Sequence, residues 1–139
     1  MVGLVLVSHS KKLAESVREL VLQMTSGDFP VAVASGVGGN HDELGTDAVH
    51  IADVIVDVVQ QMACPEGVLL LMDLGSAVLS AQTSLELIEP SVAKSVRLCP
   101  APLVEGAIAA AVCANAGGSL DEVAGEAVRG LAARVAGWS

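Results

Sequence analysis

Short apolar segments alternate along this chain with longer stretches whose apolar residues recur at helical spacing. The first apolar run carries no charged side chain, which is typical of a strand covered on both faces of a sheet. We therefore predict an α/β fold, in which helices join parallel strands. The predicted strands span Val2 to Val7, Val31 to Ser35, Val68 to Met72 and Ser95 to Leu98.

Helical patterns fill the segments between and after these strands, and turn or capping signals bound them. Ser119 followed by Glu122 forms a capping-box signature, and Glu89-Pro90 marks a helix end. The predicted helices run from Ser10 to Thr25, from about Gly45 to Met62, from Ser76 to Ile88, over Gly106 to Ala116, and from Ser119 to Val135. In the second of these, the pattern predicts that Val49, Ala52, Val54, Ile55, Val58 and Val59 are buried.

Right-handed crossovers determine the predicted strand order. If helices cover both faces, the second strand lies on one side of the first strand and the third strand on the other. The result is a doubly wound open sheet in the order 2-1-3-4, whose switch point lies between strands one and three. With 139 residues the chain fits one domain, residues 1–139.

His9 follows the first predicted strand directly, in the turn Ser8-His9-Ser10 at this switch point. A helix N-terminus disfavours imidazolium, which keeps the ring neutral and nucleophilic, and it stabilises a phosphoryl group once one is attached. Asp73 follows the third strand at the same edge of the sheet. Because a carboxylate that accepts an imidazole N–H fixes the tautomer, Asp73 is the expected orienter of His9. Each residue alone could equally cap a helix or pack in a loop.

Further candidates lie in the same crevice. Hydroxyls and free amides at helix N-termini hold phosphate oxygens well. Cations on the first helix could steer a charged partner, although they are also ordinary on a solvated face. The phosphate-binding candidates are Ser10, Thr46, Gly75 and Ser76, and the docking candidates are Lys11, Lys12 and Arg18.

Composition excludes several classes of function. The net charge of −9, without a basic stripe, argues against nucleic-acid binding. No apolar run is long enough to cross a membrane, and the chain opens on a strand, so we expect neither a membrane span nor a signal peptide. Three cysteines without CxxC spacing indicate reduced thiols in a cytoplasmic protein.

Competing motifs are weak. The glycine-rich stretch from Gly36 to Leu44 has His41 where the third glycine of GxGxxG belongs, and the chain contains no P-loop for ATP. His50 with Asp53 makes a metal site conceivable, but without a further clustered ligand we predict no metal. A receiver domain shares the topology, yet it needs an acidic cluster where this chain has Ser8-His9-Ser10.

Four segments, in matching order and spacing over about residues 2–116, resemble the DhaM family, the phosphotransferase subunits of bacterial dihydroxyacetone kinases. They are Leu4 to Ser10, Gly45 to Val49, Met72 to Ala77 and Arg97 to Gly106. The resemblance implies a mannose-type enzyme IIA domain that works as a homodimer. In that family the histidine matched by His9 accepts phosphate from HPr and passes it to ADP on the DhaL subunit, while DhaK binds dihydroxyacetone. No cofactor is then expected on this chain, because ADP or ATP belongs to the partner subunit.

Two alternatives stay open. A mannose-type sugar-transport IIA subunit is the first, although such proteins tend to carry Thr-His-Gly and Asp-Leu-x-Gly-Gly turns, which this sequence lacks. A non-catalytic module that binds an anion or nucleotide is the second. Within the DhaM family, some relatives append HPr-like and enzyme I-like domains. Because this sequence stops at Ser139, we expect separate proteins to supply the phosphate.

Overall fold

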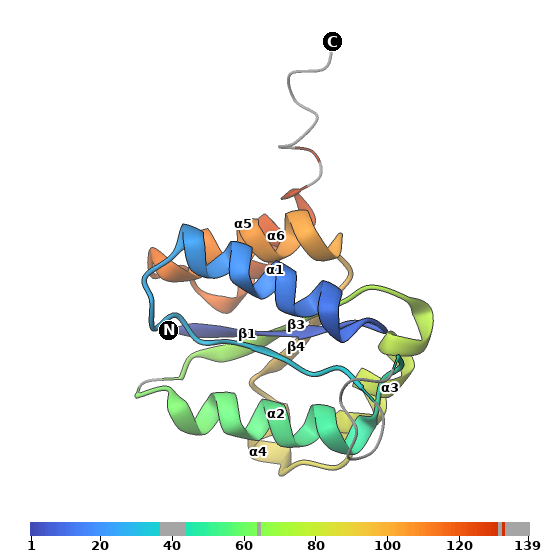
Figure 1. Ribbon diagram of the computed structural model, residues 1–139. Helices are drawn as coiled ribbons and strands as arrows, with labels where there is room; N and C mark the ends of the chain where they lie inside the picture. Colours follow the sequence, from blue (N-terminus) through green and yellow to red (C-terminus); the bar gives the residue numbers. More distant parts are fainter. Residues whose placement is uncertain (37–43, 64, 131, 133–139) are drawn as a thin grey trace.

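The computed structural model describes residues 1–36, 44–63, 65–130 and 132. Four parallel strands form one sheet in the order β2-β1-β3-β4, which confirms the predicted topology. Helices α1, α5 and α6 cover one face of the sheet, and α2, α3 and α4 lie on the other (Figure 1). The described elements are β1 (Val2–Val7), α1 (Lys11–Met24), β2 (Val31–Val33), α2 (Ala48–Gln61), β3 (Gly67–Met72), α3 (Gly75–Leu85), α4 (Pro90–Ala93), β4 (Val96–Cys99), α5 (Leu103–Asn115) and α6 (Leu120–Val128).

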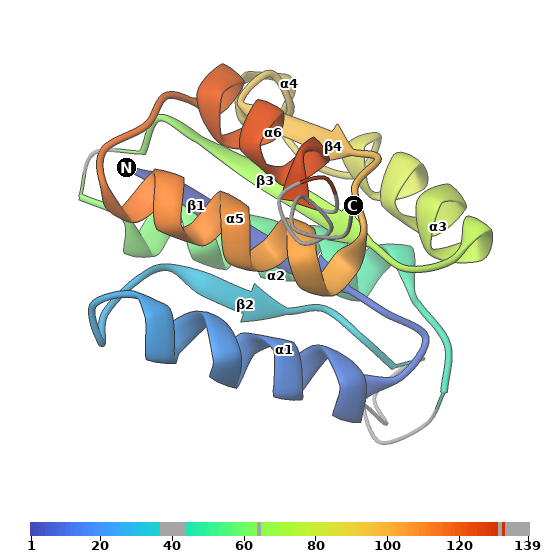
Figure 2. The same ribbon diagram turned by 90° about the horizontal axis from the view of Figure 1, so that it is seen from above.

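The central strands β1 and β3 are buried along their whole length, because both faces are covered. Side chains alternate across a strand, so successive residues enter two separate cores. Leu4 and Leu69 pack with α1, α5 and α6, whereas Val5 and Leu70 pack with α2 and α3. Figure 2 shows α5 lying along the sheet between α1 and α6. Aliphatic side chains thus supply both cores, as the near absence of aromatic residues requires.

Several boundaries differ from the predicted ones for local reasons. Strand β2 ends at Val33 rather than Ser35, because Gly36 takes a positive φ of 100° and the chain turns away. Helix α3 stops at Leu85 rather than Ile88, since Leu87 donates back to the Ser84 carbonyl in a tighter turn. Helix α4 was not predicted. Pro90 starts this short helix where the pattern indicated only an end to the helix before it.

The remaining helices also differ at their ends. Helix α5 begins at Leu103, directly after Pro102, and ends at Asn115, so it contains the predicted body from Gly106 except for Ala116. The predicted capping box at Ser119 and Glu122 is confirmed, and α6 spans Leu120–Val128. The predicted helix end at Val135 stays a prediction. Residues 133–139 lie outside the described residues.

The prediction that Val49 is buried is wrong, because 60% of its side chain is exposed in the first turn of α2. The first helix shows the same departure, since Leu13, Leu20 and Met24 are exposed while Val17 and Val21 are buried. A helical pattern therefore marks more apolar positions than the core receives.

Burial raises the pKa of the Cys99 thiol above its ordinary value. The pKa of Cys113 is also raised, first by burial and then by the neighbouring carboxylates of Glu122 and Glu126. Both thiols are therefore poor nucleophiles near neutral pH. Cys64 lies outside the described residues. None of the helices described here has the length and apolar content needed to cross a bilayer.

Candidate functional site

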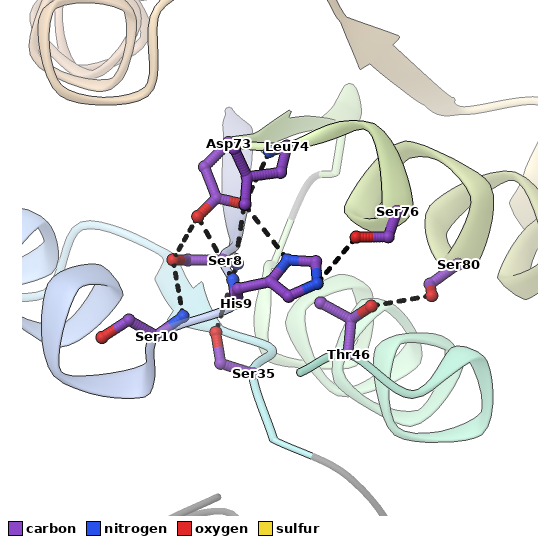
Figure 3. Close-up of polar contacts among 9 residues, drawn as sticks. All are labelled: Ser8, His9, Ser10, Ser35, Thr46, Asp73, Leu74, Ser76 and Ser80. Carbon is purple, nitrogen blue, oxygen red and sulfur yellow. Dashed lines mark hydrogen bonds and ion pairs between the residues drawn. The ribbon is translucent and has the colours of Figure 1, made fainter. Parts of the chain in front are cut away.

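The carboxyl ends of β1 and β3 bring His9 and Asp73 together, as the topology predicted. Val7 pairs with Met72 at the last rung of the ladder, so the two residues that follow lie side by side. The Asp73 N–H donates to the Val7 carbonyl at 3.3 Å. Figure 3 shows the two side chains facing each other where β1, β3 and the first turn of α3 meet.

Asp73 binds the backbone around His9 rather than the imidazole ring. One carboxylate oxygen accepts a hydrogen bond from Ser8 Oγ at 2.7 Å, and the other accepts one from the Leu74 N–H at 2.8 Å. The His9 N–H donates to both oxygens, at 3.2 and 3.3 Å. Asp73 therefore fixes the turn that carries His9 and also the start of α3.

The two ring nitrogens of His9 have different surroundings. Nδ1 is buried and has no hydrogen-bond partner among the described residues, and the nearest carboxylate oxygen, Asp73 Oδ1, is 3.9 Å away. Nε2 lies 2.7 Å from Ser76 Oγ in an exposed position (Figure 3). Nε2 is therefore the nitrogen that an incoming group can reach.

Gly75 and Ser76 form the start of α3, beside the ring. Within the described residues no side chain caps this helix, and Leu74 is its N-cap. The first N–H groups of a helix have no intrahelical partner, so the exposed first turn of α3 offers donors to an anion next to Nε2. These two residues lie where the sequence predicted phosphate binding.

Ser10 and Thr46 also lie at the site, and their hydroxyls already make hydrogen bonds. Ser10 is the N-cap of α1, and its side chain accepts a hydrogen bond from the Leu13 N–H at 3.2 Å. Thr46 Oγ1 lies 2.7 Å from Ser80 Oγ on α3. Ser10 Oγ acts only as an acceptor in this bond, so its O–H can still donate, whereas either Thr46 or Ser80 can be the donor in theirs.

The three docking candidates separate in the structure. Lys11 and Lys12 line a groove of about 550 Å³ with Ser10 and Leu44, next to the His9 turn. Arg18 lies about 10 Å further along α1. Its guanidinium donates to the Val31 carbonyl at 2.9 Å, so it binds the edge of β2 rather than the region around His9.

The other predicted features are only partly covered by the structure. His50 and Asp53 lie on α2, while His41 and most of the glycine-rich stretch lie outside the described residues. Among the residues that the structure describes, no three His, Cys, Asp or Glu side chains gather in a way that could hold a metal ion. The prediction that the chain binds no metal stays a prediction.

Sequence reasoning missed three hydroxyl residues at the site. Ser8 Oγ donates to Asp73 and accepts from the Ser10 N–H at 3.0 Å, while Ser35 Oγ accepts from the Ser8 N–H at 3.2 Å. Ser80 bonds Thr46, as described above. Ser8 adjoins His9 in the sequence and Ser80 follows Ser76 by one helical turn, so both left a signal, whereas Ser35 left none.

Five exposed apolar side chains lie at the same edge of the sheet as His9, and we call them the apolar collar. They occupy or adjoin the first two turns of α1, α2 and α3. Their exposed fractions are 42% for Leu13, 75% for Leu44, 60% for Val49, 55% for Leu74 and 66% for Leu79. Exposed apolar side chains gathered at one edge of the sheet favour contact with another protein there.

Comparison with known families agrees with this geometry. The model of the EIIA-man family, described as the PTS system fructose IIA component, matches residues 3–124. The chain belongs to the EIIA-man family. The mannose-type enzyme IIA domain implied by the four motifs is thereby confirmed.

Individual relatives show which members of this family the chain is similar to. This EIIA-man chain is 45% identical over 135 residues to a protein of Escherichia coli (strain K12) named "PEP-dependent dihydroxyacetone kinase, phosphoryl donor subunit DhaM". That match covers 96% of the chain but 28% of the relative, so the chain spans little more than a quarter of that protein's length. It is also 41% identical over 112 residues to the phosphoryl donor subunit DhaM of a second such kinase from Listeria innocua serovar 6a, covering 81% of this chain and 85% of the relative.

A solved structure shows the same fold. The crystal structure of a protein described as of unknown function superimposes with a TM-score of 0.75 at 33% identity, covering 91% of this EIIA-man chain and 92% of that chain.

Proposed function

We propose that this chain is a histidine phosphoryl carrier, with His9 as the nucleophile, in a PEP-dependent dihydroxyacetone kinase. The supporting observation is the ring of His9, which presents Nε2 outward beside the first turn of α3 and keeps Nδ1 buried next to Asp73. The similarity to subunits named DhaM supports the choice of kinase. The chain would thus be the phosphotransferase component, working in the cytoplasm and holding no cofactor of its own.

In the proposed step, the Ser76 hydroxyl donates a hydrogen bond to Nε2 in the resting state, and the ring proton is on Nδ1. When a phosphodonor docks, this hydrogen bond opens and the Nε2 lone pair attacks phosphorus. A bond forms between Nε2 and phosphorus as the bond from phosphorus to the donor breaks. The ring then carries a positive charge, which the Asp73 carboxylate near Nδ1 stabilises.

The transferred phosphoryl group needs hydrogen-bond donors for its oxygens. The exposed N-terminal turn of α3 supplies N–H groups, and Ser76 Oγ becomes free to donate as soon as Nε2 is occupied. Because the N–H groups are held by the helix, only the Ser76 hydroxyl has to reorient during the transfer.

The apolar collar favours proteins, rather than small molecules, as both the donor and the acceptor of the phosphoryl group. A free nucleotide would gain little from five exposed aliphatic side chains, whereas a protein would bury them and exclude water from the labile phosphoryl group. We therefore propose that HPr donates the phosphoryl group and that a DhaL-type subunit presents ADP to receive it. A DhaK-type subunit would bind dihydroxyacetone.

The acceptor experiment tests this assignment. The chain is labelled from phosphoenolpyruvate with enzyme I and HPr, purified, and mixed with possible acceptors. We expect an ADP-loaded DhaL-type subunit to remove the label, and addition of DhaK with dihydroxyacetone to yield dihydroxyacetone phosphate. Free ADP alone should leave the label in place, because the chain lacks a P-loop lysine.

A mannose-type IIB protein serves as the competing acceptor. The description of the matching family as a fructose IIA component favours a sugar-transport subunit as the second candidate function. Rapid discharge by the IIB protein, with none by the kinase subunits, would assign the chain to sugar transport. Failure of any label to appear would favour the non-catalytic binding module.

We also propose that the chain forms a homodimer. Leu20 and Met24 on α1 and Val104 and Val112 on α5 are exposed, and these two helices share one face of the sheet (Figure 2). Exposed apolar side chains on two neighbouring helices can be buried when two copies meet in a two-fold interface. Sedimentation at high micromolar concentration should give a dimer that Leu20→Glu dissociates, whereas a 14.0 kDa species for the unmodified chain would contradict the proposal.

A further inference from the structure

A closed circuit of contacts links the backbone of His9 to its own ring. The His9 carbonyl accepts a hydrogen bond from the Gly45 N–H at 2.8 Å. The next residue, Thr46, bonds Ser80 on α3 at 2.7 Å. One turn earlier on that helix, Ser76 bonds His9 Nε2, also at 2.7 Å (Figure 3).

The Thr46–Ser80 bond joins the segment before α2 to helix α3. Thr46 lies just before α2. The residue before it, Gly45, is bonded to the His9 carbonyl, and its hydroxyl partner, Ser80, lies on α3. Helix α3 begins without a side-chain cap among the described residues, so its first turn depends on Asp73 and on contacts along its length. Both hydroxyls are half-buried, which makes their mutual bond stronger than one in water.

We propose that Ser80 and Thr46 form a clamp that holds α3 against the segment before α2, and thereby places Ser76 on His9 Nε2. Ser80 is then a positioning residue that acts through Ser76 and does not touch the phosphoryl group. Thr46, predicted from sequence to contact phosphate, has the same positioning role. Because the clamp places Ser76 on Nε2 while Gly45 holds the His9 carbonyl, it favours one orientation of the ring.

Removing the clamp should slow phosphoryl transfer without unfolding the chain. This readout rests on the proposed function. Ser80→Ala deletes one hydroxyl and favours the helix, and Thr46→Val keeps the shape of threonine. We expect each variant to accept phosphate from phospho-HPr about three- to tenfold more slowly, the loss expected for one partly buried hydrogen bond. Ser80→Thr should restore the rate.

The control variant is Thr83→Ala, on the same helix. Thr83 is exposed, and its hydroxyl bonds the Leu79 carbonyl of its own helix at 3.0 Å. This variant should transfer phosphate at the rate of the unmodified chain. The double variant Ser80→Ala/Thr46→Val should lose no more than either single variant, because both changes break the same bond.

A second readout does not depend on phosphoryl transfer. The ¹⁵N chemical shifts of the His9 ring report the tautomer and the Nε2 hydrogen bond in the resting protein. Ser76→Ala should move them toward those of a free imidazole, and Ser80→Ala should move them part of the way, while Thr83→Ala leaves them in place. If the unmodified chain takes up no phosphate, the proposed function fails, yet these shifts still test the clamp.

Three results would overturn the clamp. One is a Ser80→Ala variant with unchanged ring shifts. Another is a Ser76→Ala/Ser80→Ala double variant whose rate loss equals the two single losses combined. That result would mean that Ser80 does not act through Ser76. The last is an equal rate loss for Thr83→Ala, which would assign the effect to the helix as a whole.

Discussion

Replacing His9 with alanine is expected to abolish phosphoryl uptake from phosphoenolpyruvate, enzyme I and HPr. No other described side chain combines an exposed nitrogen lone pair with the uncapped first turn of α3. Once His9 is replaced, the Ser76 hydroxyl loses the ring nitrogen that could act as its base and is a weak nucleophile. The variant should keep its fold, because the anchoring bond from Asp73 to residue 9 is made by the backbone N–H.

Uptake is measured as label retained by the protein, and the other two histidines provide controls. His50→Ala and His41→Ala should both label like the unmodified chain. Since the bond between phosphorus and an imidazole nitrogen is labile in acid and stable in alkali, the label should also disappear in acid. Persistent labelling of His9→Ala would show that His9 is not the phosphorylated residue. An acid-stable label would indicate serine or threonine.

Asp73→Asn is expected to slow transfer by about tenfold to thousandfold, the range of positioned electrostatic effects. The carboxylate accepts from Ser8 Oγ, the His9 N–H and the Leu74 N–H. An amide has one acceptor oxygen, so its NH₂ group would face one of these donors and leave it unpaired. The substitution also removes the negative charge near Nδ1 that stabilises the phosphorylated ring.

Rapid-mixing measurements with phospho-HPr, alongside denaturant unfolding, separate the two effects. The unpaired donor should lower the free energy of unfolding by about 1–3 kcal/mol. Asp53→Asn is the matched control, because Asp53 is an exposed acid on α2. If Asp73→Asn is less stable but transfers phosphate at the normal rate, Asp73 only holds the turn and has no electrostatic role.

Much of the fold could be predicted because its causes are local or topological. Uninterrupted apolar runs indicate buried parallel strands, and the handedness of crossovers then determines their order. The same order places the ends of β1 and β3 together, so the nearness of His9 and Asp73 was predictable without any structure. Helix ends were less predictable, since Pro90 and the turn at Leu87 depend on which carbonyl groups are close enough to accept.

The contacts within the site were harder to predict, because side-chain direction is not encoded in spacing. A carboxylate next to a histidine predicts a bond to the ring, but the nearby N–H groups of His9 and Leu74 compete for Asp73 and bind it instead. Likewise Arg18 was predicted to lie beside His9, although helical rise carries it to the β2 edge. Val49 was predicted in the core because periodicity does not show whether an apolar face is buried or exposed.

The most direct test of the proposed carrier role is a peptide mass spectrum of the unmodified chain, charged from phosphoenolpyruvate through enzyme I and HPr and kept at alkaline pH. We predict a single phosphoryl group on the peptide that begins at the N-terminus, with fragmentation assigning it to His9. A phosphoryl group on any other residue, or an unmodified chain under conditions in which HPr is fully charged, would contradict it.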